Sequence, residues 1–145
     1  MTDIVPHVTA WLRQRLPVER AASQHTCETY AYAFQLLLHF ASQKRSITPS
    51  ALQLEHIDAA LVLEFLEYLQ RVRGNAPRTR NARLTAIKSF MHFVEYRVPS
   101  ALEQINRVLV IPNQKTDIRL VDHLTAEQCQ AILTISEDAE DAYSR

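Results

Sequence analysis

The chain has 145 residues with 16 basic and 16 acidic side chains, so its formal net charge is zero. Apolar residues make up 47% and charged residues 22%, which is typical of one globular domain with a tail and argues against a disordered or fibrous protein. No apolar run approaches the roughly 20 residues of a membrane span, and no signal-peptide core opens the chain. We therefore expect a soluble, cytoplasmic protein without a membrane partner.

The single glycine, Gly74, limits the kinds of site that the chain can build. Phosphate-cradling loops need residues with positive φ, so Walker-type and dinucleotide-binding loops are excluded. Cys27 and Cys129 lack metal-ligand spacing and are interpreted as ordinary thiols of a reducing compartment. The six histidines form no HxxH or HxxxH pair. The sequence therefore predicts no cofactor and no metal site.

Apolar residues recur every three or four positions, a spacing typical of amphipathic helices. The pattern predicts a first helix from about Val5 to Leu16, ended by Pro17. A longer second helix begins near Ser23 or Thr26, either of which can cap it. Its apolar stripe contains Tyr30, Phe34, Leu37, Leu38 and Ala41, and we interpret the aromatic residues of these stripes, Trp11 included, as core.

Two further helices are expected before residue 100. The third begins near its cap, Asp58, and Gly74 takes the left-handed position just past its end. The fourth starts at Pro77 and ends before Pro99, and Ser100-Ala-Leu-Glu103 predicts a short helix after it. The inward residues are Leu61, Phe65, Tyr68, Leu69 and Val72 in the third helix, and Leu84, Ile87, Phe90, Met91 and Val94 in the fourth.

Charge is distributed unevenly along the chain. Residues 46–70 hold four acidic and no basic side chains, whereas residues 71–98 hold seven basic and one acidic. Cations in the first turns of a helix oppose its dipole by roughly 0.3–1 kcal/mol each, and a bound phosphate reverses that effect. Arg and Asn can also contact base edges, while Thr and Lys suit phosphates. The mixture favours DNA binding, although a solvated basic face is the ordinary alternative.

The segment 75–94 resembles the fourth helix of the N-terminal core-binding domain of tyrosine recombinases and phage-type integrases. That family typically has Thr or Ser, matched by Thr79, and then Arg-Leu-Ser-Ala-Leu-Arg/Lys-x-Phe, matched by Arg83-Leu-Thr-Ala-Ile-Lys-Ser-Phe90. Shorter segments are similar to the second helix, the third helix, the linker and the first catalytic helix of the family, namely Ser23-x-x-Thr26-x-x-x-Tyr30, Ile57-Asp58 with Phe65-Leu66-x-x-Leu69, Val110-Ile-Pro112 and His123-Leu-Thr-Ala-Glu-Gln128.

The resemblance implies an all-α fold, a four-helix SAM-like bundle that forms the core-binding domain, followed by a short helix. It places the DNA-binding domain at 1–110, an interdomain linker at 111–123 and the first helix of a truncated catalytic domain at 124–145. The implied partners are double-stranded DNA and, in a full-length recombinase, other protomers on paired half-sites. An isolated fragment of this kind is expected to be a monomer.

The resemblance and the local charge together identify candidate DNA contacts on the fourth helix and at the start of the second. The family's tyrosine nucleophile and its Thr-Gly-x-Arg motif have no counterpart, because Tyr143 lies in an acidic tail and no glycine precedes Arg145. We therefore expect no catalytic residue here and no enzyme activity of the fragment. The candidate contacts are Arg78, Thr79, Arg80, Asn81, Arg83, Lys88, Ser23, His25 and Thr26.

Two other functions are considered. A helical protein-interaction or regulatory domain that does not bind DNA could pair its basic stripe with an acidic partner, and the zero net charge favours it slightly. A self-sufficient enzyme would need a nucleophile with a base and an orienting group, and we find no such set.

Overall fold

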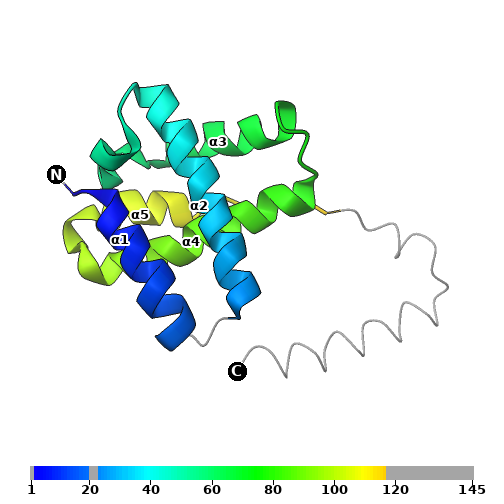
Figure 1. The fold of residues 1–145 in the computed structure, drawn as a ribbon. Coiled ribbons are helices and arrows are strands. Elements are labelled where there is room, and N and C mark those ends of the chain that lie inside the picture. The colour runs from blue at the N-terminus through cyan, green and yellow to red at the C-terminus, as the bar shows by residue number, and fades with distance from the viewer. Residues whose placement is uncertain (1, 20–22, 117–145) are drawn as a thin grey trace. The chain divides into compact units, whose positions relative to one another are not determined.

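The structure is a computed structural model that describes residues 2–19 and 23–116. Within these ranges the chain is helical, apart from loops and one isolated bridge between Asp3 and Gln53, so the all-α prediction is confirmed (Figure 1). Residues up to Gln114 form one compact unit. The elements are α1 (Ile4–Ala10), η1 (Trp11–Glu19), α2 (Gln24–Arg45), η2 (Pro49–Ala51), η3 (Leu54–His56), α3 (Ala59–Arg71), α4 (Pro77–Arg97), η4 (Pro99–Ala101) and α5 (Leu102–Leu109).

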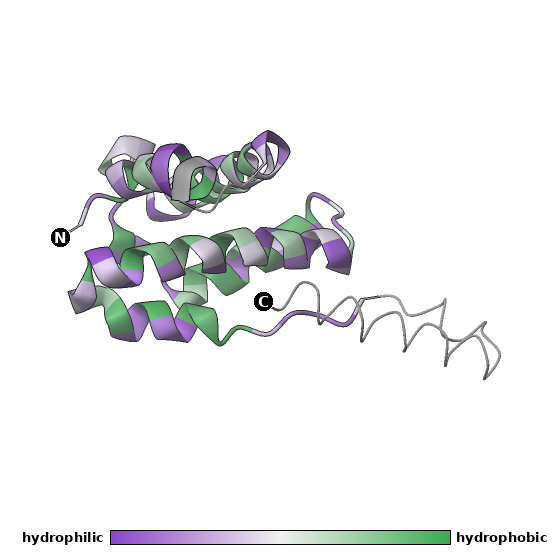
Figure 2. Ribbon diagram, turned by 90° about the horizontal axis from the view of Figure 1, so that it is seen from below, coloured by the Kyte–Doolittle hydropathy of each residue, from purple (hydrophilic) through white to green (hydrophobic). Residues whose placement is uncertain are grey.

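Helix α4 is the centre of the bundle, since it contacts α2, α3, α5 and η1. All five residues predicted to face inward from α4 are buried. Hydrophobic and hydrophilic residues alternate along the helices in Figure 2, as expected when each helix has one buried and one exposed face. The rotation of α4 about its own axis is therefore fixed by its neighbours.

An aromatic cluster joins three elements at the core. The ring of Trp11 in η1 lies 5.6 Å from Tyr30 and 5.0 Å from Phe34, both of α2, and 5.5 Å from Phe90 of α4. Edge-to-face and stacked rings at these separations add to the free energy of apolar burial. The interpretation of these aromatic residues as core is confirmed.

The predicted helix starts are confirmed at two caps. Ser23 Oγ accepts a hydrogen bond from the Thr26 amide at 3.1 Å, and Asp58 Oδ1 accepts one from the Leu61 amide at 2.9 Å. Gly74 has φ +69° after α3, the left-handed conformation expected of the chain's glycine there.

Three details of the sequence prediction are wrong. Pro17 does not end the first helix, because the chain widens into the π-helix η1 with Pro17 inside it, and the wider turn relieves the crowding between a proline ring and the carbonyl four residues back. Val72 does not face inward but is 71% exposed, because it lies at the C-cap of α3, beyond the last buried turn. Ser100 does not cap α5, because Pro99 starts a 3-10 turn that already contains Ser100.

Residues 111–116, where the linker is predicted to begin, contain no helix. That they join two domains stays a prediction. The remainder of the predicted linker and the predicted catalytic helix at 124–145 lie outside the described residues. No helix in the described ranges has the length and apolar character that crossing a membrane requires.

Replacing Phe90 with Ala is expected to lower the free energy of unfolding by about 3–5 kcal/mol, because it removes a fully buried ring that contacts both Trp11 and Phe34. Urea titration followed by circular dichroism measures the change. Tyr96→Ala is the matched control on the same helix, because Tyr96 is 80% exposed and its loss is expected to cost less than about 0.5 kcal/mol. Equal losses in the two variants would contradict the assigned core.

Candidate nucleic-acid interface

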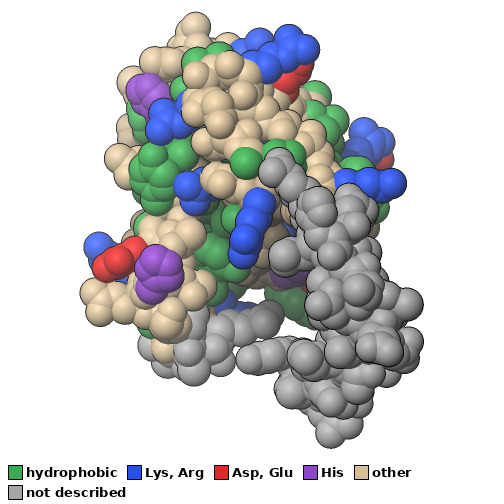
Figure 3. Space-filling model, turned by 90° about the vertical axis from the view of Figure 1, so that its right-hand side faces the viewer, with side chains coloured by type: hydrophobic (Ala, Val, Ile, Leu, Met, Phe, Trp, Pro, Cys, Tyr) green, Lys and Arg blue, Asp and Glu red, His purple; other side chains and the backbone are tan. Residues whose placement is uncertain are grey.

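Basic side chains of α4 and of the loop before it meet an exposed tyrosine of α2. Arg73 Nη2 donates a hydrogen bond to Tyr32 Oη at 3.1 Å, and the Arg83 guanidinium carbon lies 5.1 Å from the centre of the Tyr32 ring. Tyr32 is 42% exposed and Arg73 is exposed, whereas Arg83 is half-buried and its Nε has no hydrogen-bond partner among the described residues. Figure 3 views the molecule from the side where α3 ends and α4 begins, and it shows several Lys and Arg side chains with few carboxylates.

The cations in the first half of α4 have no carboxylate partner among the described residues. Arg71, at the end of α3, pairs with Glu67 at 3.0 Å, but no ion pair within the described ranges involves Arg78 or Arg83. The N-cap of α4 is Ala76, which makes no side-chain cap, and the first turn holds no acidic residue. The positive end of the helix dipole and these cations therefore both raise the positive potential at the start of α4.

Arg78 and Thr79 lie in the first turn of α4, as predicted. Arg78 is exposed and makes no hydrogen bond with a described residue, whereas Thr79 is half-buried. Such a cation can reach a ligand without breaking an existing contact.

The predicted residues at the start of α2 form a local capping arrangement. The Ser23 hydroxyl accepts from the Thr26 amide and donates to Thr26 Oγ1 at 2.9 Å, so both side chains already have partners. His25 is exposed, and the spacing 25, 29, 32 puts it on the side of α2 that carries Tyr32, about 10 Å earlier along the helix. His25 therefore lies on the same side of α2 as the tyrosine that contacts Arg73 and Arg83.

The other three predicted contacts hold the segment that follows α5. We call residues 111–114 the strap. Arg80 Nη1 donates to Pro112 O at 2.9 Å, and Lys88 Nζ donates to Ile111 O at 2.5 Å. Asn81 Nδ2 donates to Gln114 O at 2.8 Å, and the Gln114 amide donates back to Asn81 Oδ1 at 2.9 Å.

Arg80 is the one buried charged residue in the described part of the chain, with only 6% of its surface exposed. Burial lowers the pKa of its guanidinium from the usual value, but an arginine pKa is so high that the group stays charged. Arg80 Nη1 donates hydrogen bonds to the Pro112 carbonyl and, at 3.1 Å, to Asn81 Oδ1, and neither acceptor is a carboxylate.

Tyr32 and Arg73 belong to the candidate interface by their contacts, and the sequence analysis did not include them among the candidate residues. Tyr32 lies two positions after the core residue Tyr30 and therefore falls off the apolar stripe of α2. An aromatic residue off the stripe was the sequence signal that could have identified it. Arg73 lies beyond the end of α3, where the helical pattern no longer specifies a direction.

A second group of cations surrounds Phe93, near the end of α4. The guanidinium carbons of Arg97 and Arg15 lie 5.0 and 5.9 Å from the centre of the Phe93 ring. Burial, followed by the positive charge of Arg97, lowers the pKa of the nearby His7 below its usual value. His7 Nδ1 is buried and has no hydrogen-bond partner among the described residues.

Protonation of His7 is therefore expected to oppose folding. The unfolded chain takes up this proton near the ordinary histidine pKa of about 6.5, whereas the folded chain resists it to lower pH. The contribution of His7 to stability is thus complete above that value and is lost as pH falls through the lowered pKa of the folded state. His7→Gln should flatten the rise of unfolding free energy with pH in this window, measured by urea titration at several pH values. An unaltered slope would contradict the assignment.

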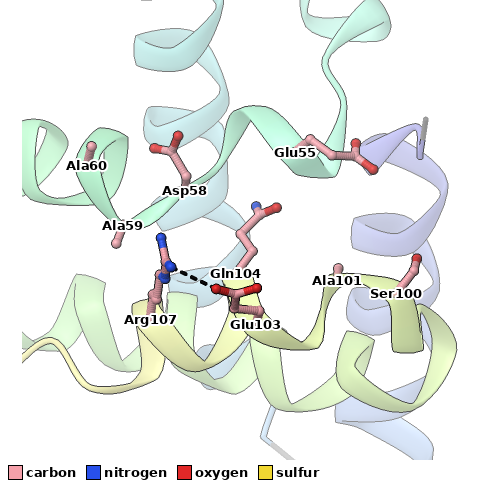
Figure 4. A pocket seen from close by; sticks show the side chains of 9 residues that line it. All are labelled: Glu55, Asp58, Ala59, Ala60, Ser100, Ala101, Glu103, Gln104 and Arg107. Atoms are coloured by element: carbon pink, nitrogen blue, oxygen red, sulfur yellow. Dashed lines mark hydrogen bonds and ion pairs between the residues drawn. The ribbon is translucent and has the colours of Figure 1, made fainter.

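Acidic side chains line a hollow of about 430 Å³ between α5 and the start of α3. Figure 4 shows Glu55 and Asp58, from the segment before α3, on one side of it and Glu103, from α5, on the other. Arg107 pairs with Glu103 at 2.7 Å. Asp58 in turn lies 3.7 Å from Arg45. Because three carboxylates and one cation line the hollow, its net charge is negative, and it is not a candidate for nucleic-acid contact.

Comparison with known proteins identifies the family to which this sequence is related. The sequence pattern of the phage integrase N-terminal SAM-like domain matches residues 8–97, a span that starts within α1 and stops at the last residue of α4. The chain belongs to the phage integrase family. The resemblance drawn from segment 75–94 is thereby confirmed, together with the SAM-like fold.

Two curated relatives come from Sinorhizobium fredii (strain NBRC 101917 / NGR234). The "Putative integrase/recombinase y4rC" is 39% identical over 131 residues, which cover 90% of this chain and 40% of that protein. The "Putative integrase/recombinase y4rD" is 37% identical over 130 residues, covering 90% of this chain and 46% of that protein. The chain therefore spans less than half of either relative, and no solved structure matches it.

Proposed function

We propose that this integrase-family domain binds double-stranded DNA through a basic face formed by α2, α4 and the loop before α4, as the DNA-binding portion of a site-specific recombinase. The observation that carries the proposal is the set of cations at the start of α4 that have no carboxylate partner in the described ranges. Such an arrangement is costly in the free protein and becomes favourable when phosphates approach.

The residues proposed to touch DNA are those whose polar groups remain available. Arg78 projects from the first turn of α4 without an intramolecular bond to a described residue, and Thr79 lies beside it. Arg83 and Arg73 are held on Tyr32, so less side-chain freedom is lost when they meet a phosphate. Guanidinium groups suit this role, because they donate two parallel hydrogen bonds to phosphate oxygens.

The start of α2 is proposed as a second contact to the same duplex. A helix N-terminus attracts a phosphate through its free amides and its dipole, and Ser23, His25 and Thr26 lie there. His25 is exposed on the side of the helix that leads to Tyr32. Two helix starts on one face can contact two positions along a DNA backbone, which fixes the orientation of the domain on the duplex.

Strand exchange is proposed to be the work of other parts of a longer protein. The printed names of both relatives describe an integrase/recombinase. The family resemblance implies a tyrosine nucleophile that forms a phosphotyrosyl link, with further recombinase protomers on paired half-sites. Because its proposed partner is DNA, the protein is also proposed to be cytoplasmic.

Replacing Arg78 with Ala should weaken binding to a generic duplex and flatten the plot of log K against log salt by about 0.9, because one phosphate contact is lost. Fluorescence anisotropy of a labelled duplex at several salt concentrations gives both quantities. Arg107→Ala is the matched control, because it removes the same charge from the rim of the acidic hollow and is expected to leave the slope unchanged.

Binding that is absent even at low salt would reject the proposal and favour a domain that recognises an acidic protein. Equal slopes for Arg78→Ala and the unmodified chain would remove Arg78 from the interface.

A further inference from the structure

We propose that Arg80, Asn81 and Lys88 form a docking site for the main chain of the strap, and that the strap stays docked when DNA binds. These three side chains are then positioning residues that fix the direction in which the polypeptide leaves the DNA-binding domain. The part of this inference that concerns the DNA-bound state rests on the proposed function, whereas docking in the free chain does not.

The docking site recognises backbone rather than side chains. The carbonyl oxygens of Ile111, Pro112 and Gln114 each accept a hydrogen bond from α4, donated by Lys88, Arg80 and Asn81 in that order. The Asn81 amide pairs with both main-chain groups of Gln114, as a neighbouring strand would. Such a site specifies one path of the main chain.

The strap is also tied to α3. The side-chain amides of Gln114 and Gln70 exchange two hydrogen bonds, at 2.7 and 2.9 Å. Gln114 is consequently held by four hydrogen bonds from two helices, although its side chain is exposed. One end of the strap is thereby joined to both α3 and α4.

The other end of the strap is anchored in the core. Ile111 is 4% exposed, and its amide donates to Val108 O at the end of α5. If Lys88 or Arg80 turned away from the strap toward a phosphate, the carbonyls of residues 111 and 112 would lose these donors, and Ile111 is buried. Arg80 is itself 6% exposed beneath the strap. A duplex can instead be contacted by Arg78 and Arg83, which require no such rearrangement.

The charges of Arg80 and Lys88 are not lost in this arrangement. Carbonyl groups are neutral, so both side chains keep a full positive charge and add to the field that attracts DNA without touching it. The docking site therefore serves two purposes, because it orients the chain while leaving the face electropositive.

Hydrogen exchange of the Gln114 amide tests docking in the full 145-residue chain, measured by NMR with and without a generic duplex. In the unmodified chain this amide is expected to exchange at least about tenfold more slowly than an unprotected amide, in both states. Asn81→Ala should remove this protection. Arg78→Ala is the matched control, since it should weaken DNA binding but leave the Gln114 amide protected.

Gln70→Leu is a second variant that leaves the start of α4 intact, and it should accelerate exchange of the Gln114 amide without altering the salt dependence of DNA binding. An unprotected Gln114 amide in the free chain would overturn the docking site. Protection that disappears when duplex is added would overturn the claim that the strap stays docked and would assign Arg80, Asn81 and Lys88 to DNA. If no duplex binds at low salt, the proposed function fails, and the free-chain exchange still decides whether the strap is docked.

Discussion

The buried face of α4 is the constraint on which the rest of the structure depends. Leu84, Ile87, Phe90 and Val94 are fully buried against the surrounding elements, so α4 cannot rotate about its axis without exposing them. The directions of Arg78 and Arg83 at the surface, and of Arg80, Asn81 and Lys88 toward the strap, follow from this one orientation. A polar site built on such a helix is positioned more precisely than one built on a loop.

The zero net charge of the chain conceals two surfaces of opposite sign. Carboxylates line the hollow beside α5, where Glu55, Asp58 and Glu103 gather. Cations without carboxylate partners among the described residues lie at the start of α4, and those partnered by Tyr32 or by main-chain carbonyls keep their charge. Separation of this kind orients a polyanion toward one face, which a count of charges over the whole sequence cannot reveal.

Local patterns were sufficient to predict most of the helical framework. The caps at Ser23 and Asp58, the left-handed Gly74 and the buried face of α4 each depend on residues within one or two turns of one another. The π-helix around Pro17 was not predictable in this way. A proline signals that an α-helical turn cannot continue, but it does not say whether the chain stops or widens.

The contacts of the candidate site were predicted less completely, because the groups that its side chains contact are distant in sequence and belong to the main chain. Arg80, Asn81 and Lys88 meet main-chain groups 32, 33 and 23 residues away, and a carbonyl oxygen has no sequence signature. A projection of α4 at 100° per residue puts Asn81 and Lys88 opposite the buried stripe and Arg80 nearer to it, which agrees with the burial of Arg80. It could not show that the outer face is partly covered by the strap.

The face that joins α2 to the start of α4 is proposed to meet DNA. Mapping amide and arginine Nε–H shifts by NMR during titration with a generic duplex tests it most directly. The largest changes are expected at His25, Tyr32, Arg73, Arg78 and Arg83, with little change around Glu55 and Glu103. Changes centred on the acidic hollow, or spread evenly over the molecule, would contradict it.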